Sequence, residues 1–248
     1  MNEAAINITD LGFSYRGGNT LFSGLNLQVP AGESFGIFGP NGAGKTSLMS
    51  LMTGLLKYEQ GKIELFGKKV APNHKSVNKL FGFVPQDFAF YDELTPVENL
   101  AFFGAWAGLG TREIKQRTDE LLEVMTLTDV RDKQVRTFSG GMKRRVNLAI
   151  GIIHHPRIIF LDEPTVGVDV HTRHDIIHYL RTLNEDGTTL VYTSHQLSEA
   201  EGLCTSIALI DNGQIIAHDT LDSLLTNHQQ QDLEGLFLAL TGKVFEDA

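Results

Sequence analysis

The sequence predicts an α/β fold with a mostly parallel sheet, an N-terminal antiparallel β-subdomain and a helical subdomain. Apolar side chains alternate with polar ones through most of residues 6–29, which is typical of antiparallel strands. Short apolar runs at 34–38, 80–84 and 158–161 have the length of buried strands. Residues 111–153, which lie between two of these runs, contain apolar side chains at helical spacing. Strands that alternate with helices favour a parallel sheet.

The N-terminal strands are expected within residues 6–15 and 25–29, and a further strand with its turns within 61–67. Tyr15 stands beside Arg16-Gly17-Gly18, where an aromatic ring next to a flexible turn could stack on a flat base. A surface tyrosine at the end of a strand is the alternative, and this residue alone does not decide between the two.

A glycine-rich loop at residues 39–46 fits the pattern G-x-x-x-x-G-K-[ST] at every fixed position, between a short strand and a helix that starts near Lys45. Its glycines let successive backbone N–H groups point at one anion, and the helix adds its positive end. Lys45 would reach the β- and γ-phosphates of a triphosphate, and the Thr46 hydroxyl would hold a bridging Mg²⁺. The sequence therefore predicts nucleotide binding in a P-loop NTPase core. The expected contact residues are Gly39, Pro40, Asn41, Gly42, Ala43, Gly44, Lys45, Thr46 and Ser47.

Composition excludes several classes of protein. The net charge of −9 over 248 residues argues against general nucleic-acid binding, which needs clustered Lys and Arg. The single cysteine, Cys204, cannot form an internal disulfide and is expected to be a small core residue. The N-terminus lacks the positive region of a signal peptide, and no apolar run approaches the roughly 20 residues of a membrane span. If the protein works at a membrane, another chain is expected to supply the spans.

The middle of the chain is predicted to form a helical subdomain over residues 87–153. Gln86 comes just past the strand at 80–84, at the sheet edge where ligands bind in such folds. The segment 87–108 is rich in aromatic residues, and it either has its own small core or presents a docking surface. Residues 111–125 read as an amphipathic helix.

Two further places carry candidate chemistry. Ser139-Gly140-Gly141 opens a second helix and is a second potential anion site. Asp162 and Glu163 follow the apolar strand at 158–161, and two acids at the end of a buried strand are costly unless a cation or a ligand occupies them.

The last third of the chain is expected to complete the core. A helix is predicted around 171–184, and a strand at 188–193 delivers Ser194 and His195 to the same sheet edge. A terminal hairpin and a short helix follow. The predicted division is an ATP-binding core with its β-subdomain at 1–86 and 154–220, the helical subdomain, and a C-terminal helical tail at 221–248.

With these pieces in order, the sequence resembles the nucleotide-binding subunit of an ABC-type transporter over nearly its whole length. The loop at 39–46 resembles the family's Walker A motif, and residues 158–163 resemble its Walker B motif. Gln86 corresponds to the family's Q-loop, Ser139-Gly140-Gly141 to its signature motif, and residues 166–169 to its D-loop. His195 resembles its switch histidine, and Tyr15 resembles its adenine-stacking aromatic. Joint occurrence in this order is far more specific than any single motif.

The resemblance implies a role for each of these residues. Asp162 would hold Mg²⁺ with Thr46 and Gln86, Glu163 would orient and deprotonate the attacking water, and His195 would hydrogen-bond the γ-phosphate. Ser139, Gly140 and Gly141 of one subunit would face ATP held by another subunit, with Asp169 at the same interface. ATP would then join two nucleotide-binding subunits, either identical or close paralogues. The family signature commonly has Gln where this chain has Met142, and a methionine there could simply pack.

The resemblance also implies partners. Residues 96–104 and 237–243 look like the bacterial drug and antibiotic exporter branch, whose permease subunits are separate transmembrane chains. The chain would then be cytoplasmic and peripheral on the inner face of the membrane. An importer ATPase is one alternative, and a soluble ABC-type ATPase of DNA repair or translation is another. A P-loop kinase or GTPase fits poorly, because no guanine-reading motif is present and the Ser-Gly-Gly helix start would have no role.

Overall fold

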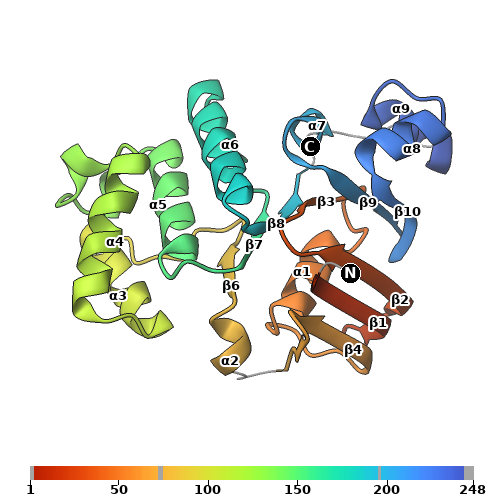
Figure 1. Ribbon diagram of the computed structural model, residues 1–248, viewed down its shortest axis with the longest axis horizontal. Helices are drawn as coiled ribbons and strands as arrows, with labels where there is room; N and C mark the ends of the chain where they lie inside the picture. The colour runs from red at the N-terminus through yellow and green to blue at the C-terminus, as the bar shows by residue number, and fades with distance from the viewer. Residues whose placement is uncertain (1–2, 72–74, 195–196, 243–248) are drawn as a thin grey trace.

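The computed structural model describes residues 3–71, 75–194 and 197–242, and its strands form two sheets (Figure 1). The N-terminal sheet has the order β2-β1-β4-β5 and is antiparallel. Apolar side chains of β1 and β2 are buried at alternating positions, which confirms the strands predicted from alternation. The strands of this sheet are β1 (Ala4–Ser14), β2 (Thr20–Pro30), β4 (Gln60–Leu65) and β5 (Lys68–Lys69).

The second sheet has the order β10-β9-β3-β8-β7-β6 and is parallel except for β10. Every residue of β3, β7 and β8 is buried, as the short apolar runs predicted. The predicted terminal hairpin is β9 and β10. The strands are β3 (Ser34–Phe38), β6 (Phe81–Val84), β7 (Ile158–Asp162), β8 (Thr189–Thr193), β9 (Ser206–Asp211) and β10 (Gln214–Thr220).

Both faces of the parallel sheet are covered. Ile158 and Phe160 of β7 pack with α1, α2 and the N-terminal sheet, while Ile159 and Leu161 pack in a second core with helices α3–α9. Cys204 is buried in that second core, and burial raises the pKa of its thiol to about 12, as expected for an unreactive core residue.

The helices gather in distinct places in Figure 1, with α3, α4 and α5 together on one side and α8 and α9 beside β10. No helix within the described ranges is long and apolar enough to cross a membrane. The helices are α1 (Lys45–Met52), α2 (Lys75–Asn78), α3 (Pro96–Ala107), α4 (Thr111–Val124), η1 (Thr128–Val130), η2 (Val135–Thr137), α5 (Gly140–Ile152), α6 (Val170–Glu185), α7 (Leu197–Leu203), α8 (Leu221–Asn227) and α9 (Leu233–Thr241).

Helix α3 lies within the predicted helical subdomain, but it was not predicted as a helix, although its sequence carries a start signal. Thr95 and Glu98 form a capping box. The backbone N–H of Glu98 donates to Thr95 Oγ1 at 3.1 Å, and the backbone N–H of Thr95 donates to Glu98 Oε2 at 2.8 Å. Pro96 follows the cap at the first helical position. Helix α7 was also missed, whereas the helices predicted at 111–125, 171–184 and the C-terminal end are confirmed as α4, α6 and α9.

The topology decides where a ligand can bind. Strands β6, β7, β8 and β3 run in parallel, so their carboxyl ends meet at one edge of the sheet. The glycine loop, the Asp162-Glu163 pair, Ser194 and Gln86 all follow these ends. Such an edge is where open α/β sheets bind their ligands.

Candidate functional site

The glycine loop between β3 and α1 surrounds the amine of Lys45. Lys45 Nζ donates hydrogen bonds to the carbonyl oxygens of Gly39 at 2.7 Å and Pro40 at 3.2 Å, and its side chain is buried. Burial lowers the pKa of this ammonium, while the charges of Glu163 and Asp162 act in the opposite direction. A cation held in a buried loop at a helix start is suited to binding phosphate.

Two glycines of this loop are needed because the chain passes close to its neighbours. A β-carbon at Gly39 would lie 2.0 Å from the carbonyl oxygen of Ile210 in β9. Gly44 has a φ of 109°, and a β-carbon there would lie 2.8 Å from the ring of Phe22 in β2. The loop is therefore pressed against both sheets, which holds its shape.

The acid pair after β7 lies beside the same loop. Asp162 is buried, and its Oδ1 accepts hydrogen bonds from Thr193 Oγ1 at 2.7 Å and Thr46 Oγ1 at 3.3 Å. Glu163 has a φ of 51°, and its backbone N–H donates to the carbonyl oxygen of Thr193 at 3.1 Å. A non-glycine residue in the left-handed region is held there by its surroundings at some cost in energy. The structure thus brings Thr46, Asp162 and Glu163 together.

These donors fit Mg²⁺ chemically. A hydroxyl and a carboxylate are the oxygen ligands that this ion prefers, and it usually completes its shell with substrate phosphates and water. In the part of the chain that the structure describes, no three His, Cys, Asp or Glu side chains form a ready-made metal site. Gln86 is exposed at the end of β6, and its backbone carbonyl accepts a hydrogen bond from Arg144 at 2.8 Å.

Tyr15 lies next to the glycine loop. Its hydroxyl is 2.8 Å from Ser47 Oγ, and its ring packs edge-on against Phe13 at 4.9 Å between ring centroids. Half of the residue, 49%, remains exposed. The structure therefore places a half-exposed tyrosine beside the loop.

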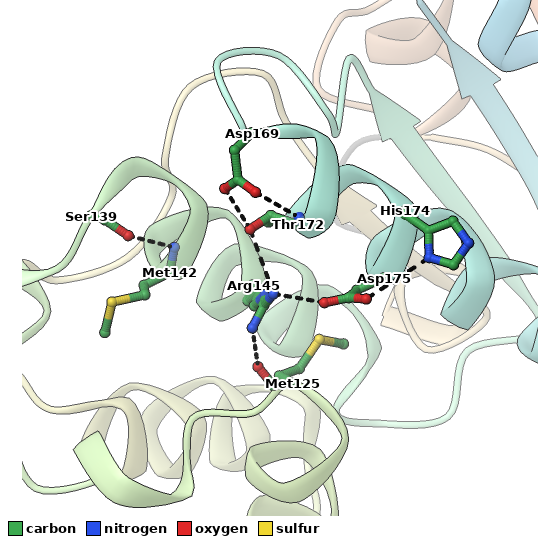
Figure 2. Close-up of polar contacts among 8 residues, drawn as sticks. All are labelled: Met125, Ser139, Met142, Arg145, Asp169, Thr172, His174 and Asp175. Carbon is green, nitrogen blue, oxygen red and sulfur yellow. Dashed lines mark hydrogen bonds and ion pairs between the residues drawn. The ribbon is translucent and has the colours of Figure 1, made fainter.

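The starts of α5 and α6 lie side by side (Figure 2). Ser139 caps α5 by accepting from Met142 N at 3.3 Å, and Asp169 caps α6 by accepting from the backbone N–H of Thr172 at 3.0 Å and its hydroxyl at 2.8 Å. The bond from the Thr172 backbone is the main reason why the pKa of Asp169 is lowered. A β-carbon at Gly141 would lie 3.0 Å from Thr172 Oγ1, so glycine allows this close approach.

This pair of helix starts is separated from the glycine loop of the same chain. In Figure 1, α5 lies on the far side of α6 from α1. Ser139, Gly140 and Asp169 are exposed. Met142 packs against the neighbouring hydrophobic core, which agrees with the expectation that a methionine at this position could simply pack. His195, expected at the end of β8, lies outside the described residues.

Glu199 of α7 is a further polar residue near the site, and the sequence analysis missed it. Its Oε2 accepts hydrogen bonds from Thr165 Oγ1 at 2.7 Å, from Ser194 Oγ at 3.1 Å and from the hydroxyl of Tyr192. Its Oε1 lies 3.2 Å from Arg173 Nε. Glu199 therefore links the segment after Glu163, the end of β8 and α6. No local motif marks it, because its partners come from distant parts of the chain.

Tyr192→Phe is expected to lower the free energy of unfolding by about 1–3 kcal/mol, because it removes a buried hydrogen bond to a charged acceptor. Tyr192 is fully buried, and burial together with Glu199 raises the pKa of its hydroxyl well above the usual value. Urea unfolding monitored by circular dichroism measures the change. The control is Tyr58→Phe, which loses a hydrogen bond to the neutral carbonyl of Val70. Equal losses in both variants would contradict the prediction.

Comparisons with known proteins identify the family of this chain. The family model described as ABC transporter matches residues 22–166. The chain is 41% identical over 208 residues to the linearmycin resistance ATP-binding protein LnrL of Bacillus subtilis (strain 168), covering 84% of this chain and 67% of the relative. It is 37% identical to the Nod factor export ATP-binding protein I of Rhizobium sp. (strain N33), covering 92% of this chain and 75% of the relative.

A solved structure described as the ATP binding subunit of an ABC transporter superposes with a TM-score of 0.87 at 27% identity, covering 96% of this chain and 99% of that one. The same family is therefore indicated by the motifs, by the fold and by relatives that match most of the chain. The chain belongs to the ABC transporter family, as one of its ATP-binding subunits.

Proposed function

We propose that this subunit hydrolyses ATP to power an exporter of drugs or other hydrophobic compounds, through ATP-driven association of two nucleotide-binding subunits. The observation that carries the proposal is the meeting of Lys45, Thr46, Asp162 and Glu163 at one edge of the parallel sheet. Phosphoryl transfer depends mainly on positioning and on charge stabilisation, and these four residues supply both.

The proposed roles combine the geometry of the described residues with the roles that the motif resemblance implies for Gln86 and His195. Lys45 and the loop N–H groups bind the phosphates, and Tyr15 stacks on the adenine. Thr46, Asp162 and Gln86 hold Mg²⁺, which when bound supplies positive charge next to the phosphate oxygens. Glu163 orients the attacking water and takes its proton, and His195 hydrogen-bonds the γ-phosphate.

A second subunit completes the site in this proposal. Ser139, Gly140, Gly141 and Asp169 are placed at exposed or partly exposed helix starts, apart from the loop of their own chain, which supports a role toward ATP on another subunit. The proposal includes the division into a core (1–86 and 154–220), a helical subdomain (87–153) and a C-terminal tail (221–248). The grouping of α3, α4 and α5 in Figure 1 supports that division.

Export is favoured over import by the relatives, whose names refer to linearmycin resistance and Nod factor export. ABC ATP-binding subunits work with transmembrane permeases, and a hollow of about 890 Å³ beside α3 is suited to receiving one. Its lining includes Phe103, Leu55 and Trp106, of which Trp106 is 83% exposed. The exposed Trp106 at this place supports the docking interpretation of the 87–108 segment. The subunit would then lie at the inner face of the membrane.

Trp106→Ser is expected to reduce recovery of the subunit with its permease about thirtyfold, since an aromatic anchor in an interface contributes about 2 kcal/mol or more. Co-purification from detergent-solubilised membranes, with the permease held at fixed concentration, measures the loss. Leu238→Ser is the matched control, because this exposed apolar side chain lies on α9, away from the hollow. Equal recovery of both variants would place the docking surface elsewhere.

The function itself is tested by purifying the chain with the membrane protein encoded next to it and measuring ATP turnover in vesicles. Hydrophobic drugs should stimulate turnover. Recovery only in the soluble fraction together with nucleic acid would instead favour the soluble ATPase, and stimulation by an external binding protein would favour import.

A further inference from the structure

Arg144, in the second turn of α5, is a buried cation that the proposed chemistry does not use. It is 4% exposed, and its guanidinium donates to backbone carbonyls rather than to acids. Nη1 donates to the carbonyl oxygens of Gln86 at 2.8 Å and Pro85 at 3.4 Å, and Nη2 donates to that of Val166 at 3.2 Å. The guanidinium also lies 4.8 Å from the ring centroid of Phe88.

The bonding of Arg144 is unusual for a buried charge. Among the described residues it makes no salt bridge, and burial is the main cause that lowers its pKa. Buried charges are costly unless they are well hydrogen-bonded, and the backbone carbonyls are what compensates this one. A planar guanidinium can place one nitrogen on each of two acceptors, which an ammonium group does poorly.

The two acceptor segments are the ones that flank the candidate site. Gln86 lies two residues after the end of β6, and Val166 lies three residues after Glu163 and three before Asp169. The backbone N–H of Val166 donates to the carbonyl oxygen of Glu163 at 3.3 Å, so Val166 belongs to the same turn. Arg144 itself lies five residues after Ser139. One guanidinium thus joins the start of α5 to the segments after β6 and β7.

Neighbouring side chains of α5 do not make this connection. Asn147 bonds the Pro85 carbonyl at 3.1 Å and the backbone of Ala89 at 3.2 Å, so it holds only the segment after β6. Arg145 points to α4 and α6, where it contacts the carbonyl of Met125 and the carboxylate of Asp175 (Figure 2). The link between both segments therefore depends on Arg144.

We propose that Arg144 is a positioning residue that holds Gln86 and the turn after Glu163 against α5. Through this link, nucleotide bound in a subunit's own site sets the position of the α5 start at Ser139, which faces the second subunit. This inference rests on the proposed function. It requires Arg144 to affect association of the subunits more than binding of the nucleotide, because its hydrogen bonds go to backbone carbonyls and none goes to a proposed nucleotide-contacting side chain. The charge of Glu163 also acts on Arg144, and the Glu163→Gln protein used in the test lacks that charge.

The test uses the full chain carrying Glu163→Gln, in which ATP-dependent dimers accumulate and are measured by size exclusion. Adding Arg144→Lys keeps the charge but removes the two-segment bridge. The ATP concentration needed for half-maximal dimerisation should rise at least tenfold, while monomer affinity for a fluorescent ATP analogue, measured at subunit concentrations too low for dimers, stays within twofold. Arg144→Gln buries no charge, and its single amide is too short to reach both segments. This variant should show the same weaker dimerisation with unchanged nucleotide affinity, even if the lysine variant folds poorly.

The matched control is Arg117→Lys. Arg117 donates to the carbonyls of Ile152 at 3.3 Å and Ile153 at 3.4 Å, so this arginine also bonds backbone of α5, but at the end remote from Ser139. If Arg117→Lys shifts dimerisation as much as Arg144→Lys, or if nucleotide affinity and dimerisation fall together in both Arg144 variants, the proposal is overturned. If Glu163→Gln alone forms no ATP-dependent dimer, the proposed function fails instead.

Discussion

Glu163→Gln is expected to bind ATP with the affinity of the parent protein and to hydrolyse it at least about a hundredfold more slowly, since positioned general bases contribute factors of this size. The amide keeps the size and hydrogen-bonding capacity of the side chain but cannot take the proton of the attacking water. Phosphate release under single-turnover conditions measures the rate, and size exclusion with ATP shows the retained dimer.

The control for this variant is Glu185→Gln, which changes an exposed carboxylate at the end of α6. Its turnover should equal that of the parent. Full turnover in Glu163→Gln would show that another group accepts the proton, and loss of ATP binding would show that Glu163 shapes the nucleotide site rather than the chemical step.

Lys45→Ala is expected to weaken ATP binding about 10- to 100-fold, because hydrogen bonds to charged groups contribute about 1.5–3 kcal/mol and each 1.4 kcal/mol is tenfold in affinity. The variant removes a buried cation and two hydrogen bonds to the loop carbonyls. Titration with a fluorescent ATP analogue measures the affinity.

Lys57→Ala provides the comparison for this second prediction, because Lys57 is an exposed lysine beyond the end of α1. Its affinity for ATP should be that of the parent protein. Thermal unfolding of both variants separates a binding defect from a folding defect. Unchanged affinity in a folded Lys45→Ala protein would contradict the assignment of the phosphate loop.

Much of the site could be predicted because its chemistry is local in sequence. The glycine loop needs a fixed spacing between Gly39, Gly44 and Lys45, since one turn of backbone must curl around one anion. The acids after β7 were equally visible, because charged residues directly after a buried strand are costly without a ligand. In the structure, these local patterns lie at the carboxyl ends of β3 and β7, as predicted.

Contacts that depend on strand register could not be predicted. Thr193 bonds Asp162 because β7 and β8 pair with Asp162 beside Thr193, and this pairing joins residues far apart in the chain. The same holds for Glu199, whose partners lie on the segment after β7, on β8 and on α6. Helix α7, which carries Glu199, had no start signal that the sequence analysis used.

The sequence by itself determined the strand, loop and helix that bind phosphate and the order of the motifs that places the chain in its family, because hydrogen-bonding geometry over a few residues requires particular side chains. Only the tertiary structure decided which distant groups meet. It placed Arg144 between Gln86 and Val166, and Asp169 beside Gly141. The physical reason is that hydrogen bonds act over about 3 Å, and packing of the whole chain sets which groups come within that distance.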